Sequence, residues 1–202
     1  MRRLLLLTVG MVALMAAVLL VVRGRGISVH RTPSAIEERV ARSAWRFLIP
    51  REVRDAANPV PNTHEVLRDG LEHFADHCAI CHANNGSGDA TIGRRIFPPA
   101  PDMRAPGTQS LTDGELFYAI EQGIPWTAMP GWRTGTPEGE QESWKLVRFI
   151  RHLPAVTPAD LNDMERLNPR TPADDARDRE IEEFLRGSKS ATPNTKKGHT
   201  HK

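Results

Sequence analysis

The sequence predicts an all-α protein, and three observations support this. An uncharged run covers Leu4–Val22 without interruption. Apolar residues recur at helical spacing in several later segments, and at two points a Ser or Thr precedes a Glu by three residues, which is the capping-box pattern. The alternation of apolar and polar residues that marks a half-buried strand is not evident. The length of 202 residues suits one ordinary domain with additional segments.

The first helix is expected to span a membrane. The 19 uncharged residues extend about 28 Å as a helix, close to the roughly 30 Å of a bilayer core. The alternative is a cleaved signal peptide, but its apolar core is usually shorter, and Gly24-Arg25-Gly26 is a poor cleavage site. We therefore expect residues 1–25 to be an uncleaved signal anchor that contacts lipid through residues 4–22. Arginines flank both ends, so charge does not fix the orientation.

A second, amphipathic helix is expected between Ser34 and Pro50, because Ser34 and Glu37 have capping-box spacing. Apolar residues follow at helical period: Ile36, Val40, Ala44 and Phe47 or Leu48. Its basic residues could face anionic lipid, or the helix could pack on the next domain: Arg39, Arg42 and Arg46. The proline-containing segment 58–63 predicts a stiff linker. Residues 26–63 are thus assigned to a juxtamembrane helix and linker.

The central domain is placed at residues 64–155. Three helices are expected in it, at about 64–76, 112–122 and 138–152. The middle one begins with the capping box Thr112/Glu115 and ends at Gly123. Short acidic helices at about 158–167 and 173–186 form a helical extension over 156–186. The Ser/Thr/Lys/His-rich tail, 187–202, is expected to be disordered, although its His199 and His201 could bind metal weakly.

Charge is unevenly distributed along the chain. Residues 1–63 hold 10 Lys/Arg and 4 Asp/Glu, a formal +6, whereas residues 64–155 hold 8 and 12, a formal −4. Residues 156–202 hold 9 of each. An acidic central domain disfavours nucleic acid as a partner, because nucleic-acid binding needs clustered cations. It favours a protein partner with a basic docking patch.

The motif Cys78-Ala79-Ile80-Cys81-His82 is the Cys-x-x-Cys-His signature of covalent haem attachment. Two thiols on one helical turn reach the two vinyl groups of one porphyrin, and the adjacent histidine binds the iron. A thioredoxin-like redox pair is one alternative, but it would need a surrounding βαβ pattern. A zinc knuckle is another, but it would need a further Cys or His at suitable spacing.

The surrounding sequence resembles the class I cytochromes c over roughly residues 64–155. "HFADHCAICHANNGSGDA" stands at the end of an N-terminal helix, "TAMPGW" resembles the distal-methionine loop, and "ESWKLVRFIRHL" resembles the C-terminal helix. The resemblance implies the cytochrome c fold around one haem c bound through Cys78 and Cys81. It also implies contact of Gly70 and Phe74 with Trp144. A carbonyl in the stretch Pro98–Pro101 is expected to accept the second N–H of the proximal imidazole.

The residues expected to bind the iron are His82 and Met129. Met129 follows His82 by 47 positions and precedes Pro130, which matches the family order. Met103, only 21 positions after His82, is expected to fill space, and Met164 lies beyond the central domain. The remaining alternatives are an open sixth site or a histidine: His73, His77 or His152.

Other side chains are expected near the haem. Trp126 and Trp132 flank Met129 and either wall the haem crevice, bind a propionate or pack in the core. Some of four loop arginines could pair with propionates: Arg94, Arg95, Arg104 and Arg133.

His/Met ligation raises the reduction potential and leaves no open site on the iron. The expected function is therefore electron transfer rather than catalysis, as a carrier or as the cytochrome subunit of a respiratory or dehydrogenase complex. The alternative is a haem sensor or a peroxidase-type enzyme with a displaceable sixth ligand. Covalent haem attachment in bacteria occurs outside the cytoplasmic membrane, which implies a single-pass protein with its haem domain on the periplasmic side. Donor and acceptor redox proteins are the expected partners.

Overall fold

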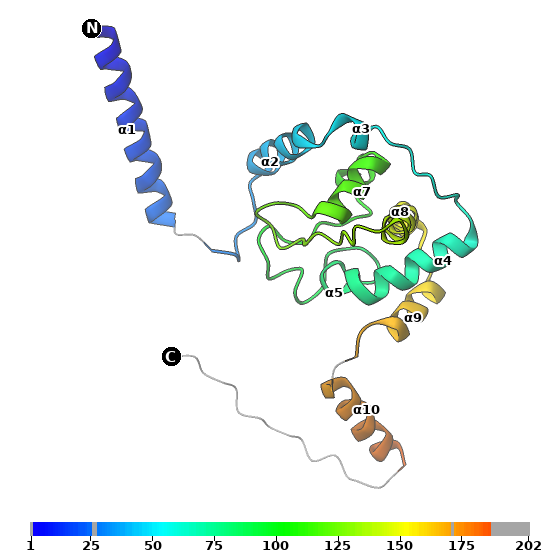
Figure 1. Cartoon of the computed structure of the whole chain (residues 1–202). Coiled ribbons are helices and arrows are strands. Elements are labelled where there is room, and N and C mark those ends of the chain that lie inside the picture. The colour runs from blue at the N-terminus through cyan, green and yellow to red at the C-terminus, as the bar shows by residue number, and fades with distance from the viewer. Residues whose placement is uncertain (1, 26–27, 171, 187–202) are drawn as a thin grey trace. The chain divides into compact units, whose positions relative to one another are not determined.

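The structure is a computed structural model that describes residues 2–25, 28–170 and 172–186. The predicted disordered tail, with His199 and His201, lies outside these residues. Within them the chain is helical and contains no strand, which confirms the all-α prediction. The elements, shown in Figure 1, are α1 Arg2–Arg25, α2 Ala35–Leu48, α3 Arg51–Arg54, α4 His64–His73, the π-helix Phe74–Cys78, α5 Ala79–His82, α6 Pro106–Gln109, α7 Asp113–Gln122, α8 Pro137–His152, the 3₁₀-helix Leu153–Ala155, α9 Pro158–Leu167 and α10 Pro172–Leu185.

The chain divides into two compact units, residues 1–167 and residues 168–202. The second unit contains α10, and Arg170 near its start pairs with Asp175 at 2.9 Å and Asp178 at 2.6 Å. In the first unit, α1 contains one segment long and apolar enough to cross a membrane, Leu5–Gly24. The helix predicted at the N-terminus is therefore present.

The core of the first unit is built on the crossing of α4 and α8, the most extensive contact between two of its described helices. Figure 1 looks nearly down the axis of α8, with α4 crossing it. A Cβ on Gly70 would lie 2.7 Å from the carbonyl oxygen of Lys145 and 2.8 Å from the Cβ of Phe149. Glycine is therefore required for so close a crossing.

The aromatic contact between these helices involves a different residue of α8 from the expected one. Phe74 packs against Phe149, with ring centroids 5.3 Å apart, whereas Trp144 stacks on Phe117 of α7 at 4.1 Å. The partner of Phe74 is thus Phe149 and not Trp144. Phe149 lies on the side of α8 that faces Gly70. Trp144, five residues earlier, lies about 140° around the helix and faces α7.

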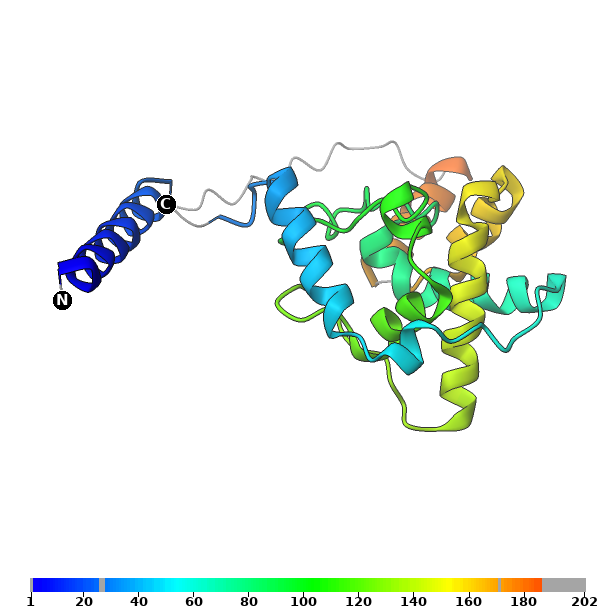
Figure 2. The same ribbon diagram turned by 90° about the horizontal axis from the view of Figure 1, so that it is seen from above.

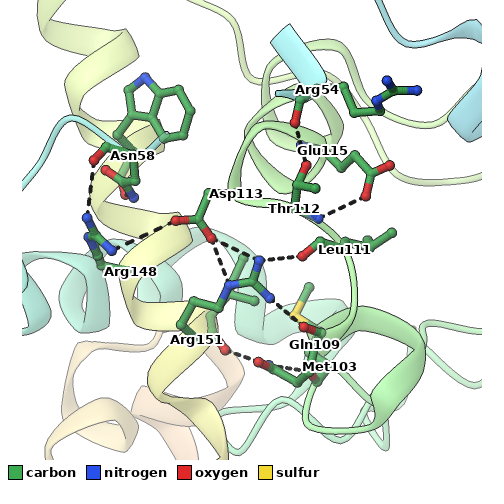
Figure 3. Close-up of polar contacts among 12 residues, drawn as sticks. Arg54, Asn58, Met103, Gln109, Leu111, Thr112, Asp113, Glu115, Arg148 and Arg151 are labelled. Atoms are coloured by element: carbon green, nitrogen blue, oxygen red, sulfur yellow. Dashed lines mark hydrogen bonds and ion pairs between the residues drawn. The ribbon is translucent and has the colours of Figure 1, made fainter. Parts of the chain in front are cut away.

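A polar network ties α8 to α7 and to the loop before α7 (Figure 3). Arg151 donates from Nε to Asp113 Oδ1 at 2.9 Å, and its terminal nitrogens donate to the carbonyls of Gln109 and Leu111. The side-chain amide of Gln109 donates in turn to the carbonyl oxygen of Met103 at 2.8 Å. The backbone around Met103 is therefore fixed by α8.

Residues 58–63, predicted as a linker, are held against α8. The side-chain amide of Asn58 donates to the Trp144 carbonyl at 2.9 Å, and Arg148 Nε donates to the Val60 carbonyl at 2.8 Å. Val60 is itself buried. The two prolines keep the segment extended, but the hydrogen bonds to α8 make it part of the domain surface.

The polar side of α2 packs on the domain, as one of the two interpretations of this helix expects. Arg46 Nε donates to Glu115 Oε1 at 2.7 Å, and Arg42 donates to the carbonyl of Gly107. Glu115 is fully buried and also closes the predicted capping box of α7 with Thr112. In both Figure 1 and Figure 2, α2 lies on the opposite side of the domain from α9.

The helix α9 contributes to the same core. Met164 is fully buried and belongs to the core cluster, and α9 contacts both α4 and the π-helix. The compact unit accordingly extends to Leu167. Met164 had been placed beyond the central domain, but its thioether is part of the packing that supports the domain.

Candidate functional site

The motif Cys78–His82 lies on a helix that continues from α4. The expected helix ends near Asp76, but the structure runs on without a break through the π-helix, Phe74–Cys78, and α5, Ala79–His82. Single π-turns are concentrated at functional sites. The helix ends at Ala83, where φ is 58°. Both cysteines and His82 therefore stand on the last turns of one helix, as the attachment chemistry requires.

The two cysteines form no disulfide, and the pKa values of both thiols are raised. Burial, with a smaller contribution from neighbouring Cys81, raises the pKa of Cys78 to about 12. Burial also raises the pKa of Cys81. Redox-active Cys-x-x-Cys pairs instead have a lowered thiolate pKa near cationic groups. The electrostatic environment therefore disfavours the thioredoxin-like interpretation.

His82 has the properties of a metal-binding imidazole. It is buried, and burial lowers its pKa to about 4, so the ring is neutral at physiological pH. Its Nδ1 is shielded from solvent and has no partner within strict hydrogen-bond geometry. The Pro101 carbonyl partly opposes the lowering of the pKa, which makes it the candidate for the acceptor expected in the stretch Pro98–Pro101.

Met129 lies in a compact turn that folds back on the end of α7. Its N–H donates to Thr127 Oγ1 at 3.1 Å, and its carbonyl accepts from the N–H of Ile124 at 3.2 Å. The chain beyond the turn is held as well, because the N–H of Trp132 donates to the Ile120 carbonyl at 2.9 Å. The loop that carries Met129 is therefore fixed at both ends.

An aromatic contact links this loop to the cysteine motif. Trp132 packs edge-on against His77, the residue before Cys78, with ring centroids 5.5 Å apart. The expected methionine loop and the attachment turn are thus neighbours in space although about 50 residues apart along the chain. Trp126 is 95% exposed, which excludes the core-packing alternative for this residue.

The other candidate ligands have structural environments of their own. The side chain of Met103 packs against the core, and its backbone N–H donates to the Gly86 carbonyl at 2.8 Å. Met164 is fully buried in the core. The rings of His73 and His77 are 5.0 Å apart, and both line a surface hollow with charged residues of α4, the π-helix and α8. Burial and the neighbouring His77 lower the pKa of His73.

The four loop arginines fall into two groups. Arg94 pairs with Asp89 at 2.5 Å, and Arg104 pairs with Asp102 at 2.8 Å. Arg95 and Arg133 are exposed, and neither forms an ion pair with any residue that the structure describes. These two remain the arginines with a free guanidinium for an anionic group.

Comparison with known families agrees with the geometry. Residues 65–150 match the family model described as cytochrome c oxidase, cbb3-type, subunit III. The central domain is a class I c-type cytochrome. The predicted cytochrome c fold is thereby confirmed. A cytochrome c domain implies haem c and electron transfer, and the residues present fit that cofactor: two protonated thiols and a neutral, buried imidazole share one turn.

Several residues of the cytochrome c domain were not found by sequence reasoning. Thr127 caps the turn of Met129, and its position two residues before the methionine is a recognisable Ser/Thr-turn signal. Phe149 has no comparable signal, because it is one of several apolar residues on α8. Glu121 is buried and accepts from Ser143 Oγ at 2.5 Å, a contact that only the folded chain creates.

Proposed function

We propose that the cytochrome c domain holds one haem c, bonded to Cys78 and Cys81, with His82 and Met129 as axial ligands, and that it transfers single electrons. One observation carries the proposal. A buried, neutral His82 stands on the cysteine turn, and the fixed loop of Met129 contacts the residue before that turn through Trp132. This contact supports the proposal that the proximal and distal candidates belong to one site.

The haem supplies the one-electron chemistry when bound, and the protein sets its potential. A thioether ligand favours ferrous iron, so His/Met ligation gives a positive shift of the reduction potential. The Pro101 carbonyl orients the His82 ring through Nδ1. Exposed apolar side chains in or beside the two ligand segments would be covered by a porphyrin: Ile80, Trp126 and Trp132. Arg95 and Arg133 are the proposed propionate partners.

Carbon monoxide distinguishes electron transfer from the alternative of a sensor or peroxidase. If Met129 fills the sixth position, the ferrous protein should bind carbon monoxide slowly or not at all at neutral pH. It should also exchange electrons with small redox proteins and show no peroxidase turnover. Stopped-flow mixing of the reduced protein with carbon monoxide measures this directly. Rapid and complete formation of a carbonyl complex would mean an open site and would favour the sensor or enzyme.

The proposed location is the bacterial cytoplasmic membrane, with α1 as a single-pass anchor and the cytochrome c domain on the periplasmic side. The length and composition of Leu5–Gly24 support an anchor, although a signal sequence has similar properties. The haem-attachment motif supports the periplasmic side. The protein is either an electron carrier or a subunit of an oxidoreductase complex, and the match to the family of cytochrome c oxidase, cbb3-type, subunit III supports the subunit role. A formal charge of −4 on residues 64–155 favours basic partners, whose docking salt weakens.

The fate of the N-terminus tests the anchor. Full-length protein produced in a bacterium competent for haem attachment should remain with the membrane fraction after a high-salt wash, because the apolar helix is inserted rather than adsorbed. Mass spectrometry of the mature protein should still detect residues 4–22. A soluble mature form that begins near Ile27 would show that the segment is a cleaved signal.

A further inference from the structure

The helix α2 is amphipathic, yet its apolar side faces away from the domain. Four of its large apolar side chains are strongly exposed: Ile36 at 74%, Val40 at 62%, Phe47 at 85% and Leu48 at 68%. At about 100° per residue, Ile36, Val40 and Phe47 fall within about 40° of one another. Because packing on the domain usually takes the apolar side of a surface helix, this stripe lacks the contact that its composition predicts.

The polar side of α2 is the one that holds it to the domain. Arg46 pairs with the fully buried Glu115, and Arg42 donates to the Gly107 carbonyl. Ile49, just past the end of the helix, is 3% exposed. These contacts fix the rotation of α2 about its own axis. The outward direction of Ile36, Val40 and Phe47 is therefore determined by the domain.

The length of chain between α1 and α2 limits what can cover the stripe. Arg25 ends α1 and Ala35 begins α2, so ten residues of extended chain allow a separation of at most about 35 Å. Arg31 shortens this further, because its guanidinium lies over the Phe97 ring at 4.8 Å and it pairs with Glu37 at 3.0 Å. The domain is thus held within about 20 Å of the end of α1, measured along the chain from residue 25 to residue 31.

We propose that the apolar stripe of α2 lies in the headgroup region of the bilayer that α1 spans, and so fixes the orientation of the cytochrome c domain on the membrane. The proposal rests on α1 being the membrane anchor. An amphipathic helix of this kind inserts its apolar side about 5–10 Å into the interface. Three side chains alone bind weakly, but the tether makes the contact intramolecular and raises its effective concentration.

Charge is complementary to such a surface. Residues 26–63 hold six Lys/Arg and four Asp/Glu, a formal +2, and Arg23 and Arg25 at the end of α1 add two positive charges. Anionic phospholipid attracts basic residues beside a membrane helix. The acidic residues of the domain lie after residue 63, where the formal charge is −4. Anionic lipid is therefore attracted more strongly to the α2 side than to the rest of the domain.

A nitroxide label at position 43 tests the proposal. Ser43 is exposed and lies beside Ile36 and Phe47 on the helix, so Ser43→Cys keeps all four apolar side chains. Full-length protein with ferrous, low-spin haem is placed in nanodiscs of zwitterionic and anionic phospholipid. The collision rates of the label with oxygen and with a water-soluble nickel chelate are then measured by electron paramagnetic resonance. Glu165→Cys on α9, also exposed, is the matched control.

We expect the ratio of oxygen to nickel collisions to be several-fold higher at position 43 than at position 165. Adding Ile36→Ser, Val40→Ser and Phe47→Ser should return position 43 to the value at 165, while these exposed replacements leave the fold intact. A third label, Ala13→Cys in α1, reports the anchor independently. If the label at position 13 is in lipid while the label at position 43 is fully accessible to the nickel chelate, the stripe is exposed to water or binds another protein. The lipid proposal is then wrong. If position 13 is also in water, the anchor proposal fails first.

Discussion

Replacing Met129 with alanine should abolish the weak far-red absorption band of ferric haem bound to a thioether sulfur. It should also lower the reduction potential by on the order of 0.1 V or more, within the roughly 0.8 V range that axial ligands control. The reason is that the soft sulfur stabilises ferrous iron, and its removal leaves water or no ligand at the sixth position. Optical spectra of the ferric protein and a redox titration measure the two effects.

The matched control is Met103→Ala. The Met103 side chain packs on the core, so its loss should cost stability without changing the iron ligands. The far-red band should survive in this variant. Loss of the band in Met103→Ala and its retention in Met129→Ala would reverse the assignment. Carbon monoxide should bind rapidly only to the variant that has lost the band, because loss of the thioether ligand opens the iron to small ligands.

The substitution Gly123→Ala should destabilise the fold and loosen the methionine loop together. Gly123 has φ 70° and ψ −173°, a region that is essentially restricted to glycine. A Cβ there would also lie 2.7 Å from the Met129 carbonyl oxygen and from backbone atoms of Pro130 and Gly131. Strain and overpacking together should lower the free energy of unfolding by about 2–5 kcal/mol. Guanidinium titration, followed by far-UV circular dichroism, measures the loss.

Gly135→Ala separates the two causes. Gly135 also has a positive φ, 79°, but a Cβ there would have no neighbour within 4 Å. It should cost only about 1–2 kcal/mol and leave the far-red band unchanged. For Gly123→Ala, the band should disappear at a lower guanidinium concentration than the helical signal. Equal behaviour of the two variants would mean that the contact with the methionine loop has no influence on ligation.

Local signals predicted much of the fold. The capping boxes at Ser34/Glu37 and Thr112/Glu115 form as predicted, since each depends on residues three positions apart. Gly123 ends α7 for the same local reason. The Cys-x-x-Cys-His motif located the attachment turn, because its chemistry needs adjacent residues on one helical turn.

Features that depend on contacts between distant segments could not be predicted in this way. The choice of Phe149 as the partner of Phe74 depends on the rotation of α8 relative to α4. The burial of Met164 requires α9 to fold back onto the core. The outward direction of the apolar stripe on α2 is set by the ion pair of Arg46 with Glu115, 69 residues away. A helical-period pattern identifies an amphipathic side but does not say which surface that side will meet.

The π-helix Phe74–Cys78 has a consequence for insertions and deletions in this chain. A π-turn accommodates one residue more than the α-helix around it. Because the π-turn takes up this residue, α5 keeps nearly the phase of a regular helix that is one residue shorter. Removing one residue here would therefore give a regular α-helix that presents Cys78, Cys81 and His82 in nearly the same direction. Removing a residue within α5 would instead rotate the residues after it by about 100°. A change of length is therefore compatible with cofactor attachment at the π-turn but not within the Cys-x-x-Cys-His motif.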